Sequence, residues 1–285
     1  EAVVNNGTTS EDDEAVQKAD IVRSDASGIM SCKRLELTDG TTGSEPWNFV
    51  APFAFNALTA EYTMTAPVGT AGTNSFGTLC LPFNITEAKH TVAENNEIDI
   101  DIFCLDKSKD LLLPEGNGES TVYLTKVNNP AETSLNNTPM LVTNNGTFTG
   151  SGLVSATNWG ERAYDGLMVG VYQKTQPELH TWLLQKHKIG GKDKLAFYRV
   201  EKPEYYTAAG KTAPLALNPF RCYIMRLPAD TSDDAPANPA AQNSEARRMV
   251  IVIDGEVVEL PQAEAEESTK LRPKSIDKLS GRKLE

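Results

Sequence analysis

The chain has 285 residues, of which 39% are hydrophobic and 23% charged, so it can build a core and is not disordered by composition. Its 39 acidic and 27 basic residues give a net charge of −12, which disfavours a nucleic-acid-binding protein, because such proteins present a basic face to phosphate. The longest apolar run, Met249 to Ile253, is far shorter than the ~20 residues that cross a bilayer, so we expect no membrane-spanning segment.

Both ends of the chain are polar. Residues 1–30 hold seven acidic residues against two basic ones and show no apolar periodicity, which predicts a flexible acidic leader. The chain begins at Glu1 without a signal-peptide pattern, so we expect either that a signal peptide has been removed or that the chain was shortened for expression. Residues 261–285 are first acidic and then basic with no apolar stripe, and we expect a tail or linker there.

Between these ends the apolar residues recur mostly at every second position, as in strands with one buried face. The strand candidates are 58–64, 77–83, 97–103, 121–127, 140–143, 167–172, 181–186, 195–200, 221–227 and 249–253. Gly190-Gly191 between two such runs predicts a β-hairpin, and Asp254-Gly255 predicts another tight turn.

Many short strands without a long helical pattern predict an all-β fold. We expect an antiparallel β-sandwich over 31–260, either as one large sandwich or as two stacked ones, with the flexible leader before it and the tail after it. If this region is divided, the boundary is expected near 144–159, where turn residues are frequent.

Four cysteines lie far apart in the sequence, at Cys32, Cys80, Cys104 and Cys222. They form no CxxC pair, which disfavours a zinc ribbon or a thioredoxin-like site. They are either buried thiols that act as small hydrophobes or members of one or two disulfides, and both alternatives stay open.

The sequence contains no catalytic motif such as GxSxG, HExxH, a Walker loop or GxGxxG after a strand, so we predict that it is not an enzyme. The candidate metal ligands are Asp99 and Asp101, which alternate with isoleucines and would project from one face of a strand. Such a row is a solvent-facing polar edge with Ile98, Ile100 and Ile102 facing the core, a calcium site or one part of a glycosidase acid pair. Calcium is the only cofactor considered.

Aromatic side chains provide the candidates for ligand contact. Trp182, Tyr205 and Tyr206 are the candidates for stacking on a sugar ring, and the two tyrosines adjoin a loop bounded by Pro203 and Gly210. The alternative for Trp182 is a place in the core of the sandwich.

Several phrases of the sequence are familiar when they are taken together. They are LTDG (37–40), FVAPF (49–53), AEYT (60–63), GTLCLPF (77–83), NTPMLV (137–142), GTFTG (146–150) and NPFRCYI (218–224). This ordered series resembles a C-terminal β-rich module of Bacteroidetes secreted and cell-surface proteins, and IDKLSGRK (276–283) is similar to a phrase that often follows it. Met140 and Cys222 stand where Tyr and Ala are usual in that family.

The resemblance implies an extracellular or cell-surface location and brings no catalytic residues. We therefore expect an exported, non-catalytic module for surface display, adhesion or glycan contact, with a glycan or a surface protein as partner. Alternatives are an accessory domain or remote relative of a polysaccharide-degrading enzyme that uses Asp99 or Asp101, and a structural spacer. The sequence makes no prediction of the oligomeric state.

Overall fold

The computed structural model describes residues 18–19, 23–24, 28, 30–39, 48–65, 76–93, 96–109, 120–189, 192–200, 204–206, 212–214, 216–226 and 248–258. This described part is all-β, as predicted, and its one helical element is the 3-10 turn η1 (Pro130–Glu132). The predicted tail at 261–285 lies outside the described residues. So does most of the predicted leader, but β1 (Lys18–Ala19) and β2 (Arg23–Ser24) fall within it, and both pair with β3 (Met30–Thr38).

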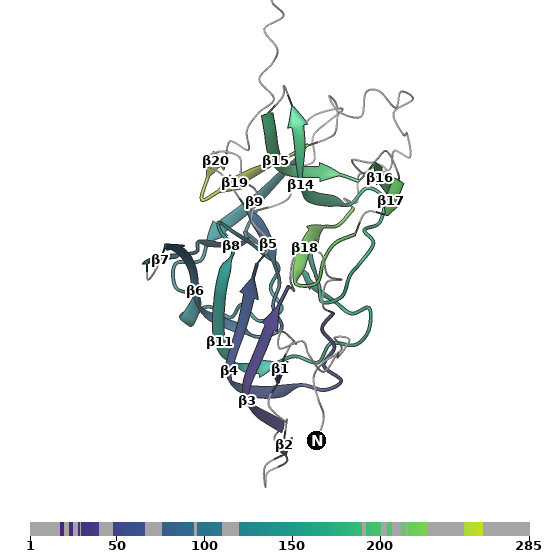
Figure 1. Ribbon diagram of the computed structural model, residues 1–285. Coiled ribbons are helices and arrows are strands. Elements are labelled where there is room, and N and C mark those ends of the chain that lie inside the picture. Colours follow the sequence, from purple (N-terminus) through teal and green to yellow (C-terminus); the bar gives the residue numbers. More distant parts are fainter. Residues whose placement is uncertain are drawn as a thin grey trace, which may run out of the picture.

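A seven-stranded sheet forms one half of the fold (Figure 1). In spatial order it contains β1, β3 (Met30–Thr38), β4 (Phe55–Met64), β11 (Gly146–Val154), β6 (Asn84–Ala93) and β7 (Asn96–Asp99), and β2 pairs with β3. The expectation of purely antiparallel pairing is wrong here, because β3 and β4 run parallel. The chain between them is long enough for the crossover connection that a parallel pair requires.

Strand β11 is central in this sheet, where it pairs with β4 on one side and β6 on the other. Residues 144–159 therefore contain a central strand of this sheet, and the predicted domain boundary there stays a prediction. Its glycines allow the neighbouring strands to come close: a Cβ atom on Gly150 would lie 1.8 Å from the carbonyl oxygen of Asn84. The turn-like composition of β11 thus reflects close strand contact.

An eleven-stranded sheet forms the other half. In order it contains β12 (Arg162–Asp165), β13 (Met168–Val171), β18 (Arg221–Ile224), β14 (Trp182–Ile189), β15 (Lys192–Arg199), β19 (Arg248–Ile253), β9 (Ser120–Lys126), β8 (Ile102–Leu105), β10 (Met140–Val142) and β5 (Gly77–Leu79), and β20 (Glu256–Val258) pairs with β19. Strand β19 fills the place between β15 and β9 and runs parallel to β9. A separate pair joins β16 (Glu204–Tyr206) and β17 (Thr212–Pro214).

The predicted hairpin and the predicted Asp254-Gly255 turn of this sheet are both confirmed. Strands β14 and β15 pair antiparallel, from Trp182 with Arg199 to Ile189 with Lys192, whereas Gly190-Gly191 between them lie outside the described residues. Asp254 and Gly255 join β19 to β20 with φ angles of 50° and 88°, and two successive positive φ angles are typical of a type I′ turn. Figure 1 shows β14 and β15 at the top of the view and β3, β4 and β11 side by side below them.

The larger sheet curls so that its last strand, β5, lies beside β18. The Cys80 N–H donates to the Phe220 carbonyl (3.0 Å), and the Cys222 N–H donates to the Thr78 hydroxyl (3.2 Å). Strand β10 consequently has cores on both faces: Met140 faces the core shared with the smaller sheet, and Leu141 faces a second core within the curl. This two-sided burial explains its continuous apolar sequence.

One buried ion pair joins the two sheets. Arg221 on β18 donates to the Tyr62 hydroxyl on β4 (2.9 Å) and to Oδ2 of Asp39 just after β3 (2.9 Å). The other Asp39 oxygen accepts from the Thr65 backbone N–H at 2.9 Å. The side chain of Asp39 is 4% exposed and that of Arg221 is 11% exposed, so the charges are largely shielded from water. Burial raises the pKa of Tyr62 to about 12.

Candidate functional site

The strand expected at 97–103 is interrupted between the two aspartates. Asp99 ends β7 in the smaller sheet, whereas Asp101 precedes β8 in the larger sheet, so the chain passes from one sheet to the other between them. Ile98, which was expected to face the core, is 44% exposed because it lies on the outermost strand of the smaller sheet. Ile100 is buried, as expected.

Each aspartate has its own lysine partner. Lys89 Nζ lies 2.7 Å from Asp99 Oδ1, and this hydrogen bond is the main reason why the pKa of Asp99 is lowered. Lys126 Nζ lies 2.8 Å from Asp101 Oδ1. Within the part of the chain that the structure describes, no group of three or more His, Cys, Asp or Glu side chains is placed to hold a metal ion. The calcium hypothesis stays a prediction.

The predicted aromatic candidates have different positions. Trp182 is 2% exposed and packs in the core within the curl of the larger sheet, so its ring has no surface for a sugar. Its buried indole Nε1 has no hydrogen-bond partner among the residues that the structure describes. Tyr205 and Tyr206 lie on β16, where their backbones pair with Ala213 and Thr212, but their side chains lie outside the described residues.

The most exposed aromatic side chains of the described residues lie next to β12. Trp159 is 67% exposed and Tyr164 is 63% exposed. Trp159 stands in the turn before β12, and Tyr164 lies within that strand. Among the described strands, β12 is the last one of the larger sheet, so its outer edge has no strand partner there.

Hydrogen bonds hold the turn of Trp159 in place. The backbone N–H of Asn158 donates to a Glu161 carboxylate oxygen (2.5 Å), and the Glu161 N–H donates back to the Asn158 carbonyl (3.0 Å). Gly160 has a φ of 82° and donates its N–H to Oε1 of Gln173 (3.0 Å). Gln173 is 5% exposed and its Nε2 donates to the Phe49 carbonyl, so the turn is anchored to the core.

A polar network lies two residues from Tyr164. Nη1 of Arg162 donates to the Tyr223 hydroxyl (2.7 Å) and lies 3.5 Å from Oε1 of Glu178, and its Cζ is 5.9 Å from the centre of the Tyr223 ring. The pKa of Tyr223 is raised, first by burial and then by Tyr164 and Glu178, whereas Arg162 opposes this shift. Arg162 therefore contacts the Tyr223 hydroxyl directly, and Glu178 is linked to it through Arg162.

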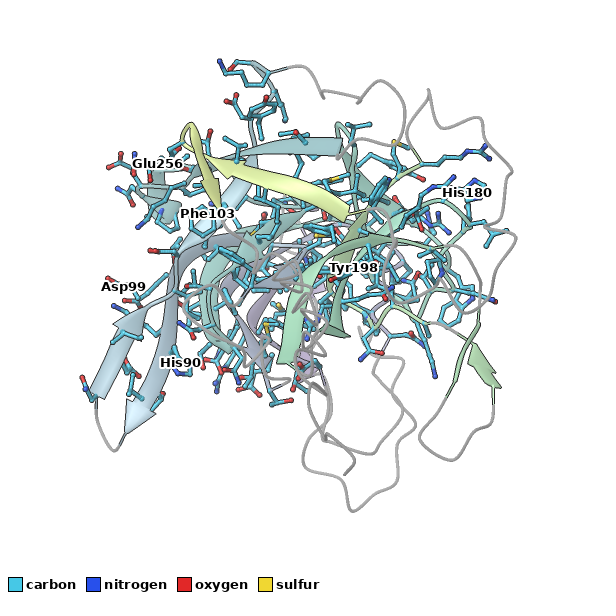
Figure 2. The ribbon with its side chains drawn as sticks, turned by 90° about the horizontal axis from the view of Figure 1, so that it is seen from above. His90, Asp99, Phe103, His180, Tyr198 and Glu256 are labelled. Atoms are coloured by element: carbon cyan, nitrogen blue, oxygen red, sulfur yellow. The ribbon has the colours of Figure 1, made fainter. Side chains whose placement is uncertain are left out.

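The turn that carries Glu178 is also held by hydrogen bonds. The Thr181 hydroxyl donates to the Glu178 carbonyl (2.7 Å), and the His180 N–H donates to the Val200 carbonyl (2.8 Å). Leu179 between them is 46% exposed. Figure 2 shows His180 on the opposite side of the molecule from His90 and Asp99, so this turn and the β6–β7 hairpin present separate surfaces.

These residues form one candidate site, which we name the β12 edge. It consists of Trp159, Arg162, Tyr164, Glu178, Leu179 and Tyr223. In this site Tyr164 lies two residues from Arg162 on β12, Arg162 is held by the Tyr223 hydroxyl and approaches Glu178, and Trp159 is exposed in the turn that precedes the same strand. Such a combination of apolar faces with a few placed polar groups is typical of sites that bind small polar ligands.

Sequence reasoning did not select this site. Trp159 lies between Asn158 and Gly160, and turn residues on both sides of a tryptophan indicate a surface position. Trp182 lies in a predicted strand, and alternation shows which residues share a face of a strand but not which face is covered.

Comparison with models of known families, with curated proteins and with solved structures finds no match to this chain. In the described residues no helix has the length and apolar character needed to span a membrane.

Proposed function

We propose that this chain is an exported, non-catalytic β-sandwich module that serves in surface adhesion or display, and that it contacts glycans through the β12 edge. The observation that carries the proposal is the position of Trp159, whose side chain is 67% exposed on a turn that hydrogen bonds anchor to the core. An export route and a cell-surface location rest on the resemblance to Bacteroidetes surface modules.

The physical chemistry of the site supports this function. An exposed tryptophan ring gains favourable free energy when a ligand covers it and removes it from water. A large exposed apolar side chain on a fixed turn is therefore typical of contact surfaces. The C–H face of a sugar ring can cover such a ring, while its hydroxyl groups bind nearby polar side chains. Trp159, Tyr164 and Arg162 together offer both kinds of contact.

No described contact favours the alternative of a polysaccharide-degrading enzyme. A glycosidase needs two carboxyl groups on opposite sides of a bond. Asp99 and Asp101 instead lie in ion pairs with Lys89 and Lys126 in different sheets.

A glycan-array screen tests the proposal, with the purified chain in calcium and again in EDTA. Trp159→Ala is expected to lower binding at least tenfold. Leu58→Ala is the matched control, because Leu58 is 69% exposed but lies on β4 in the other sheet, and this variant should bind like the wild type. Equal binding by Trp159→Ala contradicts the proposed surface, and absence of binding by the wild type favours the spacer role. Loss of binding in EDTA would support the hypothesis that Asp99 and Asp101 are calcium ligands.

A further inference from the structure

The β12 edge places a group that only donates hydrogen bonds beside a group that only accepts them. A guanidinium has five N–H donors and no acceptor, and an ionised carboxylate has acceptors only. Nη1 of Arg162 and Oε1 of Glu178 are 3.5 Å apart, and the two side chains are 25% and 73% exposed. Both groups therefore reach the solvent at the same place.

A pair of neighbouring hydroxyl groups complements this arrangement. A hydroxyl both donates and accepts, so one hydroxyl can accept from Arg162 while its neighbour donates to Glu178. We infer that the β12 edge binds neutral glycans through a vicinal diol, with the C–H face of the sugar against Trp159 or Tyr164. This inference rests on the proposed function and specifies the class of glycan.

Charge disfavours an anionic ligand at this site. Carboxylate, sulfate and phosphate groups are acceptors only, so beside Arg162 they would meet the negative charge of Glu178. The net charge of the whole chain, −12, adds to the repulsion.

The size of the site disfavours a protein partner. A stable protein interface buries about 800 Å² on each partner and involves about 20–30 residues a side. The large apolar side chains exposed at the β12 edge are Trp159, Tyr164 and Leu179. This set matches the dimensions of a short saccharide better than those of a protein surface.

Matched polysaccharides test the inference. The probes are 1,4-linked glucan, mannan and galactan, whose sugars keep a free 2,3-diol, and the 1,4-linked uronans that differ from them by a carboxylate at C6. A 1,3-linked glucan is the second control, because its internal sugars have no two neighbouring free hydroxyls. At least one of the neutral 1,4-linked probes is expected to bind ten times more tightly than its uronan and than the 1,3-linked glucan. Periodate, which cleaves vicinal diols, should abolish this binding.

A variant of the acceptor makes the test specific. Glu178→Gln keeps the shape of the side chain but removes its charge, so the preference for the neutral probe over its uronan should fall below threefold. Glu87→Gln is the control, since Glu87 is an exposed acid on the smaller sheet, and it should leave the preference unchanged.

The outcomes separate the inference from the proposed function. Three results would overturn the vicinal-diol inference and leave the proposed function standing, provided that binding depends on Trp159. They are binding of the uronan that equals or exceeds that of the neutral probe, equal binding of the 1,3-linked glucan, and binding that resists periodate. An unchanged preference in Glu178→Gln also overturns the inference. If the wild type binds none of the probes and no other glycan on the array, both fail.

Discussion

Replacing Arg221 by methionine tests the buried ion pair that joins the two sheets. The substitution removes the donor to the Tyr62 hydroxyl and to Oδ2 of Asp39, each at 2.9 Å. The Asp39 side chain, only 4% exposed, then keeps its charge without this cation. Removal of one partner from a buried ion pair costs about 3–5 kcal/mol, a large part of the ~5–15 kcal/mol that stabilises a typical domain.

A double-mutant cycle separates the pair from its surroundings. Asp39→Asn alone leaves a buried cation without its anion and should also cost about 3–5 kcal/mol. The double variant Asp39→Asn/Arg221→Met contains neither charge, so its cost should be at least ~2 kcal/mol below the sum of the single costs. Tyr62→Phe, which removes only the acceptor hydroxyl, is the milder variant if the others do not fold, with an expected cost of about 1.5–3 kcal/mol.

Urea unfolding followed by tryptophan fluorescence measures these free energies, because Trp182 is buried in the native state. Lys126→Met is the control, since it removes an ion pair whose two side chains are both 42% exposed and should cost less than about 1 kcal/mol. An Arg221→Met variant within ~1 kcal/mol of the wild type, or strictly additive single costs, would refute the role of this pair in joining the sheets.

Three further predictions follow from burial and close contact. Burial raises the pKa of Tyr62 to about 12, so above pH 10 the unfolded chain releases this proton before the folded chain does. The free energy of unfolding should therefore fall by up to about 1.4 kcal/mol per pH unit towards pH 12. Tyr62→Phe should flatten this slope in urea titrations at pH 9, 10 and 11. Gly150→Ala should lower the melting temperature and cost at least about 1–3 kcal/mol, because its Cβ would lie 1.8 Å from the Asn84 carbonyl oxygen; an unchanged melting temperature contradicts this close approach of β11 and β6. Burial raises the pKa of the Cys80 thiol and raises that of the Cys222 thiol to about 12. Iodoacetamide at pH 8 should therefore modify both thiols at least 100-fold more slowly in the native chain than in urea. Equally fast modification would show that the thiols are accessible.

Local sequence patterns predicted the all-β class and many of the strands. Alternation located β4, β9 and β14, and turn chemistry located the Gly190-Gly191 hairpin. Strand β11 escaped prediction because its glycines, which allow close strand approach, are also typical of loops. The parallel pairs β3–β4 and β9–β19 depend on contacts between distant segments, on which local periodicity carries no information.

Three of the familiar phrases meet at one place in the structure. Asp39 comes from LTDG, Tyr62 from AEYT and Arg221 from NPFRCYI, and they form the ion-pair network between the sheets. From the sequence alone, Asp39 is an acidic residue in a turn, Tyr62 an aromatic residue in a strand and Arg221 a basic residue in another strand. Their contacts explain these three phrases as parts of the packed core between the sheets.

The central place of β19 has a consequence for the order of events during synthesis. Its partner β9 is made early, but β19 follows about 130 residues later, since Ser120 pairs with Met249. At ~5–20 residues per second the ribosome takes about 6–26 s to supply it. Until then the ladder between β15 and β9 stays open, and both strands expose edges that can pair with other chains. Closure of the larger sheet is therefore a late step of biogenesis, and a chain that ends before Arg248 should aggregate even though most of its strands are present.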